Sequence, residues 1–257
     1  KAHKTPQFWF LWIVLCMNVS AGIGIIGAAA PMLQETFGGA LIGHADLGFA
    51  DLKKEAPGVQ LIPVAADITT EAGRVALFSV PGGPGKDFDI VVTNAGGPPP
   101  GDFRSWDRQT WIDAIDANML TPIELIKAVI DPMIARRFGR IINITSGSVK
   151  HPLEVLGLSN GARSGLTGFV AGIARQVARH NVTINNLLPG FHETDRSITT
   201  MKAMAEKNGI TPEAMKAERI GHIPAARIGD PAEFGDACAY LCSAQAGFII
   251  GQNLLLD

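Results

Sequence analysis

From residue 58 onward, short unbroken apolar runs alternate with longer segments of periodic apolar positions. The runs are 58–67, 88–97, 139–147, 182–190 and 251–257. Uninterrupted runs of this length are typical of strands covered on both faces, as in parallel sheets. Between residues 105 and 137 the apolar residues instead recur at three- and four-residue steps, from Ile112 to Met133, which indicates helices with a buried face.

The order of these elements predicts the fold class. Helical segments follow the runs at 71–80, 105–117, 117–137, 158–178, within 191–219, and at 230–243. Alternating βα units with right-handed crossovers predict an α/β fold, a Rossmann-type doubly wound parallel sheet in a three-layer α/β/α arrangement. We expect a single domain over 1–257, with an atypical segment 1–52 that takes the place of the first βαβ unit.

Three polar, glycine-containing motifs end three of the predicted strands. They are "NAGG" (94–97), "TSGS" (145–148) and "LPG" (188–190). In doubly wound sheets ligands bind outside the carboxyl ends of the strands. The three motifs therefore predict one shared pocket.

Composition narrows the classes of function. The chain has 257 residues, 47% of them hydrophobic, and a formal net charge of -2, which gives no reason to expect a nucleic acid or an anionic membrane as partner. Three cysteines argue against a disulfide framework and for a reducing, cytoplasmic location. Cys238 and Cys242 share a helical face without further ligands nearby, so we expect core residues and no metal site.

Several motifs in a fixed order resemble the short-chain dehydrogenase/reductase family over about 53–257. They are "PVAADIT" (63–69), "TNAGG" (93–97), "DANMLTP" (116–122), "GRIINITSGS" (139–148), "NNLLPGFHET" (185–194) and the segment 227–257. The helix motif "SNGARSGLTGF" (159–169) resembles a 3-oxoacyl-ACP-reductase-like branch. The resemblance implies an oxidoreductase that transfers hydride between NAD(P)(H) and a carbonyl or alcohol substrate.

The resemblance also implies site residues. Cofactor contacts are implied for Asp67 and Ile68 at the adenine, for Asn94, Ala95 and Gly96 along the cofactor, and for Pro189, Gly190 and Thr194 at the nicotinamide. Asn118 would hold the water of a proton relay, and Ser146 would bind the substrate carbonyl. Three of these residues also have a purely structural alternative: Asn94 would be a turn residue, Thr194 a helix cap and Ser146 an ordinary polar residue at a strand end.

The family's catalytic tyrosine and lysine positions match Ser159 and Arg163. In the family the lysine charge lowers the pKa of the phenol from about 10. An alkyl hydroxyl is a much weaker acid, and an arginine keeps its proton, although Arg163 could still hold ribose hydroxyls or a phosphate. The sole tyrosine, Tyr240, is on a late helix that should pack far from this site.

Three interpretations of the Ser159/Arg163 pair stay open. Another group donates the proton, with Lys150, His151 and His192 as candidates. Alternatively, the protein is a non-catalytic remnant that binds the dinucleotide, or the pair serves an unusual substrate.

The N-terminal segment departs from the family's glycine turn. "MNVSAGIG" (17–24) keeps the last two glycines of that turn, Gly22 and Gly24, and has Asn18 where the first one belongs. Glycines there would let the backbone approach a pyrophosphate. We expect the segment to fold at least partly into the first βαβ unit, with a second strand around 39–46, because the sheet would otherwise have an open edge.

Residues 5–52 also resemble the opening of a major facilitator transporter of the oxalate/formate antiporter branch. No formally charged residue lies between Lys4 and Glu35, and about 20 apolar residues suffice to span a bilayer. A membrane-tethered fusion is therefore the alternative if 8–33 is one spanning helix. Otherwise the resemblance to the short-chain dehydrogenase/reductase family implies two kinds of partner: a small-molecule carbonyl or acyl substrate, and further copies of this chain in a homo-tetramer or dimer. NAD and NADP are not distinguished.

Overall fold

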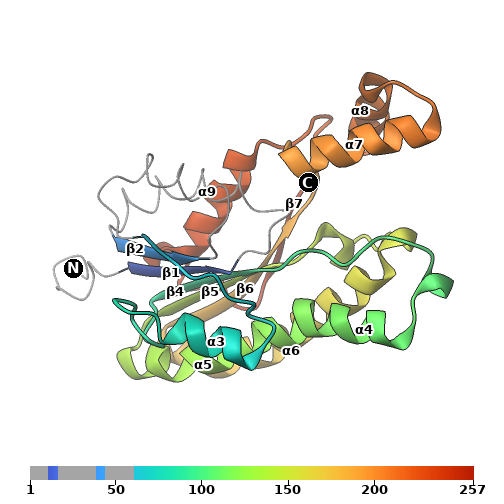
Figure 1. Ribbon diagram of the computed structural model, residues 1–257. Coiled ribbons are helices and arrows are strands. Elements are labelled where there is room, and N and C mark those ends of the chain that lie inside the picture. Colours follow the sequence, from blue (N-terminus) through green and yellow to red (C-terminus); the bar gives the residue numbers. More distant parts are fainter. Residues whose placement is uncertain (1–10, 17–38, 44–60) are drawn as a thin grey trace.

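A parallel seven-stranded sheet organises the computed structural model, which describes residues 11–16, 39–43 and 61–257 (Figure 1). The strand order is β3-β2-β1-β4-β5-β6-β7. The strands are β1 (Leu11–Cys16), β2 (Gly39–Gly43), β3 (Leu61–Pro63), β4 (Ile90–Asn94), β5 (Gly139–Ile144), β6 (Val182–Pro189) and β7 (Asn253–Leu256). The chain order reverses between β1 and β4, which is the switch point where doubly wound sheets bind ligands.

Helices cover both faces of this sheet. They are α3 (Glu71–Phe78), α4 (Arg108–Ile115), α5 (Thr121–Arg136), α6 (Gly157–Val177), α7 (Asp195–Asn208), α8 (Pro212–Gly221) and α9 (Pro231–Cys242). Figure 1 shows α3, α5 and α6 on one face, α9 on the other, and α7 with α8 projecting beyond the sheet. The three-layer α/β/α prediction is confirmed.

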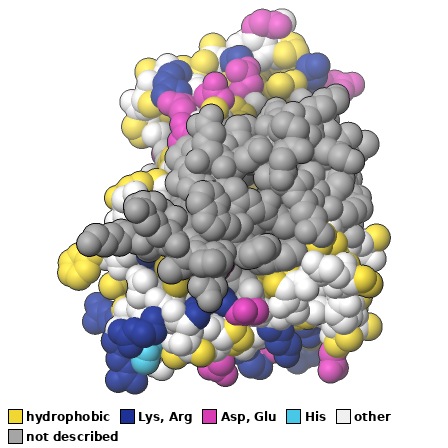
Figure 2. All heavy atoms as spheres, turned by 90° about the vertical axis from the view of Figure 1, so that its left-hand side faces the viewer, with side chains coloured by type: hydrophobic (Ala, Val, Ile, Leu, Met, Phe, Trp, Pro, Cys, Tyr) yellow, Lys and Arg dark blue, Asp and Glu magenta, His cyan; other side chains and the backbone are white. Residues whose placement is uncertain are grey.

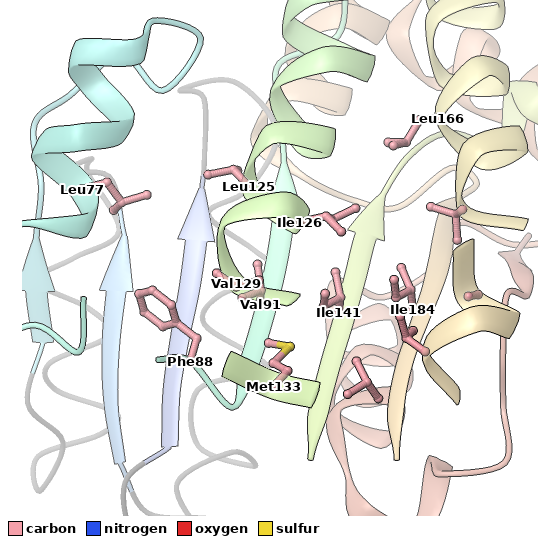
Figure 3. Close-up of a cluster of buried hydrophobic side chains, with 14 of the residues drawn as sticks. Leu77, Phe88, Val91, Leu125, Ile126, Val129, Met133, Ile141, Leu166 and Ile184 are labelled. Atoms are coloured by element: carbon pink, nitrogen blue, oxygen red, sulfur yellow. The ribbon is translucent and has the colours of Figure 1, made fainter. Parts of the chain in front are cut away.

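Each sheet face has its own hydrophobic core. On the α5 and α6 face, Val91, Ile141 and Ile184 pack with helix residues that include Leu125 and Leu166 (Figure 3). On the α9 face, strand residues such as Ile142 and Leu187 pack against Phe234, Cys238 and Cys242. Both cysteines are buried and free, so the prediction that they are core residues is confirmed.

The helices expected at 105–117 and 117–137 are joined without a break. Asp116–Leu120 forms a π-helical turn, η4, between α4 and α5. A π turn inserts a residue into the helical ladder and is frequent at functional sites. The boundary predicted at residue 117 is therefore a local widening of the helix.

The described part of the N-terminal segment lies in the sheet. β1 pairs with β4 and β2, and β2 pairs with β3, all in parallel. The second strand expected around 39–46 is thus confirmed at Gly39–Gly43, whereas one continuous helix over 8–33 is wrong, because Leu11–Cys16 is a strand. In the parts of the chain that the structure describes, no helix has the length and apolarity to cross a membrane.

Figure 2 views the molecule from the left-hand side of Figure 1. In the described part of this face, acidic and basic side chains are interspersed with apolar ones.

Candidate active site

The polar motifs at the ends of β4, β5 and β6 lie side by side. Asn94 is in register with Ile144, and Ile144 is in register with Leu187. The amide of Thr145 donates to the carbonyl oxygen of Leu187 over 2.9 Å, so the pairing continues one residue past β5. Three segments distant in sequence therefore meet at one edge of the sheet.

Arg163 connects these segments. It lies on α6, is 9% exposed, and its Nη2 donates to the carbonyl oxygen of Ala95 over 3.1 Å. Its Nη1 donates to the carbonyl oxygen of Thr145, and its Nε donates to Oδ1 of Asn118 over 3.1 Å. A guanidinium keeps its proton in proteins, so the carboxyl edge of β4 and β5 holds a fixed positive charge.

Asn118 is oriented by the π turn. It is buried, and its Nδ2 donates to the carbonyl oxygen of Ala114 over 3.3 Å. Its Oδ1 is thereby directed to Arg163. The structure thus brings Asn118 and Arg163 together, as their predicted shared site requires.

Ser146 and Ser159 flank this cluster. Ser146 directly follows Thr145, and its Oγ accepts from the amide of Ser148 over 3.1 Å. Ser159 is 6% exposed and precedes Arg163 by four residues on α6, so both side chains lie on the helix face that packs on the sheet. Two hydroxyl groups and one cation therefore belong to one end of the sheet.

The predicted Pro-Gly loop leaves β6 beside the end of β7. Pro189 is in register with Leu256, and the amide of Gly190 donates to the carbonyl oxygen of Leu256 over 2.7 Å. A Cβ on Gly190 would lie 2.5 Å from that oxygen, so this approach requires glycine. Thr194 caps α7, because its hydroxyl accepts from the amide of Ser197 over 3.3 Å. The structural alternative proposed for Thr194 is therefore present.

A pocket of about 270 Å³ lies next to the residues that follow this loop. Its lining includes Phe191, His192, Ile223, Glu233 and Asp257. Ala95, Asn118 and Thr145, which accept hydrogen bonds from Arg163, are not among its lining residues.

The remaining predicted cofactor residues lie apart from the cluster around Arg163 or outside the described residues. Asp67 and Ile68 follow β3, which is three strands from β4, or roughly 14 Å at the usual strand spacing. Asp67 Oδ1 accepts from the amide of Thr69 over 3.0 Å. Asn18, Gly22 and Gly24 lie outside the described residues, as do His44 and Asp46.

A ladder of side-chain hydrogen bonds beneath the site was not anticipated. Thr93 Oγ1 donates to Asn143 Oδ1 over 2.8 Å, and Asn143 Nδ2 donates to Asn186 Oδ1 over 3.1 Å. Asn186 Nδ2 then donates to Asn253 Oδ1 over 2.7 Å. These four residues are register partners on adjacent strands, on the α6 face. Asparagines inside apolar runs were the available sequence signal.

Among the described residues, Tyr240, His151 and His192 are poorly suited as proton donors to this site. Tyr240 is 49% exposed on α9, across the sheet from α6 (Figure 1). His151 is exposed. Burial lowers the pKa of His192, which contacts the ring of Phe234 at a centroid distance of 5.3 Å, so its imidazole is mostly neutral near pH 7.

Comparison with known proteins settles the family. The family model described as Enoyl-(Acyl carrier protein) reductase matches residues 20–257. The chain belongs to the short-chain dehydrogenase/reductase family. Because the match begins at residue 20, the family pattern extends well into the segment 5–52, and the comparisons give no support to a transporter origin.

Curated relatives and solved structures agree with this assignment. The chain is 34% identical over 246 residues to the 3-oxoacyl-[acyl-carrier-protein] reductase FabG of Vibrio harveyi, covering 94% of each chain. It is 35% identical to FabG of Vibrio cholerae over 168 residues, which are 65% of this chain and 64% of that relative. L-sorbose reductase from Gluconobacter frateurii, solved with NADPH and L-sorbose, is 25% identical with a TM-score of 0.84, over 97% and 96% of the two chains.

Proposed function

We propose that this protein is an NAD(P)H-dependent reductase of a small carbonyl-containing substrate, similar to the 3-oxoacyl-ACP reductases. The observation that carries the proposal is the convergence on Arg163, which joins the ends of β4 and β5 to Asn118 at the carboxyl edge of the sheet, beside the switch point between β1 and β4. The description of the matched family model names an enoyl reductase, which reduces a carbon–carbon double bond, whereas the FabG relatives are named as 3-oxoacyl reductases, which reduce a carbonyl group.

The described residues fit a nicotinamide dinucleotide. The half-buried residues 94–96 follow β4, and Gly190 allows the Pro-Gly loop to lie against β7. We assign Asn94, Ala95 and Gly96 to contacts along the cofactor, and Pro189, Gly190 and Thr194 to its nicotinamide half. Asp67 and Ile68, beyond β1 and β2 in the sheet order, are assigned to the adenine half.

The chain's own groups position the substrate and stabilise charge. When bound, the nicotinamide supplies the hydride. Ser146 and Ser159 donate hydrogen bonds to the substrate oxygen, while Arg163 contributes a fixed cation, held by Asn118, at the place where negative charge develops. Neither serine hydroxyl releases its proton easily.

We further propose a homo-oligomer with α6 at an interface. The outer face of α6 has room for a neighbour, since a Cβ on Gly168 or Gly172 would meet no atom within 4 Å. Sedimentation equilibrium tests this: a dimer or tetramer is expected, and a monomer at all concentrations would contradict it.

A cofactor titration tests the proposed function. Quenching of protein fluorescence by NADPH, with NADH in parallel, should give saturable binding. Gly190→Ala should weaken binding at least about tenfold, because its Cβ forces the loop away from Leu256. Gly221→Ala, at the end of α8 where a Cβ would meet no atom within 4 Å, is the matched control. Absence of binding at millimolar cofactor would reject the reductase and leave a non-catalytic scaffold.

A further inference from the structure

The Ser159/Arg163 pair limits which reductions this site can complete. Hydride addition to a carbonyl carbon produces an alkoxide, a strong base that needs a proton from a nearby acid. In the family such an acid is the tyrosine, but the only tyrosine of this chain is Tyr240, across the sheet on α9. Ser159 has an alkyl hydroxyl, which donates a hydrogen bond but is a weak acid.

Arg163 cannot replace the missing acid, because its three nitrogens each donate to a protein oxygen and the guanidinium stays protonated. It does bring a buried positive charge to the ends of β4 and β5, next to Ser146. Such a charge stabilises an anion without transferring a proton. The site is therefore equipped for an oxyanion of low basicity.

An enolate is such an anion. When the β carbon of an α,β-unsaturated carbonyl compound accepts hydride, the electron pair of the carbon–carbon double bond moves toward the carbonyl. The negative charge is then shared between the oxygen and the α carbon. The oxygen needs only hydrogen-bond donors and a nearby cation, and the α carbon takes its proton from water.

We infer that the substrate is an α,β-unsaturated carbonyl compound and that its carbon–carbon double bond is reduced. The inference rests on the proposed function and selects between its two reductions. The β carbon gains the hydride with two electrons from the reduced nicotinamide, which becomes oxidised. The α carbon gains a proton from water, which leaves hydroxide. Ser146, Ser159 and Arg163 stabilise the enolate oxygen, and no protein group transfers a proton.

Two six-membered ring ketones, 2-cyclohexenone and cyclohexanone, distinguish reduction of the carbon–carbon double bond from reduction of the carbonyl group. With NADPH that carries deuterium at C4, 2-cyclohexenone should give cyclohexanone labelled at the β carbon, at least about tenfold faster than cyclohexanone is reduced. Labelled alcohol from either compound, formed faster than the saturated ketone, would overturn the inference and leave the proposed function intact. NADPH binding without turnover of either compound would also overturn it.

A paired variant tests the role of the missing acid. Ser159→Tyr with Arg163→Lys restores the family's acid and should shift the product from saturated ketone toward alcohol. An unchanged product ratio in a variant that still binds NADPH would contradict the assigned roles.

A binding measurement gives a readout that is independent of turnover. In the complex with NADP⁺, 4-nitrophenol serves as an oxyanion probe, and its ionisation midpoint should fall by about one pH unit on binding. Ser159→Ala should make that shift smaller, because one of the three groups that stabilise the oxyanion is lost. Ser79→Ala, at an exposed position after α3, should preserve it. A bound probe that titrates like the free phenol would refute an oxyanion site.

Discussion

Strand β5 has a buried arginine at each end, and the two differ in what surrounds them. Arg140, on the strand near its amino end, is 1% exposed and donates to the carbonyl oxygens of Ser243 and Asn181 over 2.9 Å each. Arg163 reaches the other end from α6 and donates to Ala95, Thr145 and Asn118. Both guanidinium groups bind backbone carbonyls, so their chemistry alone does not separate a structural residue from a functional one. Their positions in the sheet do distinguish them, because of these two residues only Arg163 lies at the carboxyl edge, where such sheets bind ligands.

The largest expected effect is on stability at the amino end. Arg140→Met would leave the carbonyls of Ser243 and Asn181 buried without their donor, and the free energy of unfolding should fall by about 3 kcal/mol or more. Urea denaturation measures the loss. Arg175→Met, at an exposed position on α6, should stay within about 0.5 kcal/mol of the parent. A loss below about 1 kcal/mol would mean that water replaces Arg140 easily.

Arg163→Met, unlike Arg140→Met, should weaken cofactor binding as well as reduce stability. We expect a loss of about 2 kcal/mol in stability, and in addition NADPH binding weakened at least about tenfold, because the segment that follows β4 loses its tie to α6. NADPH titration of the folded protein checks this. Arg140→Met should leave the cofactor affinity of the folded fraction unchanged. If Arg163→Met also leaves it unchanged, Arg163 is a structural brace like Arg140.

The sequence predicted the strands well because each is an apolar run closed by a turn. All five runs found from residue 58 onward contain a strand of the sheet, and the shared edge of "NAGG", "TSGS" and "LPG" follows from parallel topology. The second N-terminal strand was also predicted, from the need to cover an edge.

Features that depend on register or on one shifted hydrogen bond could not be predicted. The π turn at Asp116–Leu120 leaves the apolar periodicity almost unchanged, so it was interpreted as a helix boundary. The hydrogen bonds from Arg163 to Ala95, Thr145 and Asn118 could not be predicted either, because they depend on how α6 is placed against the ends of β4 and β5. The Thr93–Asn143–Asn186–Asn253 ladder requires knowing which residues are opposite one another.

The Thr93–Asn143–Asn186–Asn253 ladder allows a test, with a smaller expected effect, of what stabilises the carboxyl ends of the strands. Asn186→Val would leave Asn143 Nδ2 and Asn253 Oδ1 without their partner, and should cost about 1–3 kcal/mol in unfolding free energy. Asn253→Val should cost less, because Asn253 is only half-buried on the edge strand, where water can replace it. Urea denaturation of both variants checks the order. Equal losses would contradict a graded ladder.

The smallest expected effect is the pH dependence contributed by His192, which lies beside the Pro-Gly loop. Burial against Phe234 lowers the pKa of His192 below its usual 6.5, although Glu233 and Asp257 act in the opposite direction. The imidazole therefore binds a proton more readily in the unfolded chain. Its contribution to stability is complete above about pH 6.5 and is lost as the pH falls through the lower, folded value.

Because His192 is only half-buried, this loss should stay below about 1 kcal/mol. Unfolding free energies at pH 7.5 and 5.5 should therefore differ less in His192→Asn than in the parent. His222→Asn, at an exposed position after α8, should keep the parental difference. If His192→Asn also kept it, the acid sensitivity would come from carboxylates and not from the imidazole beside the Pro-Gly loop.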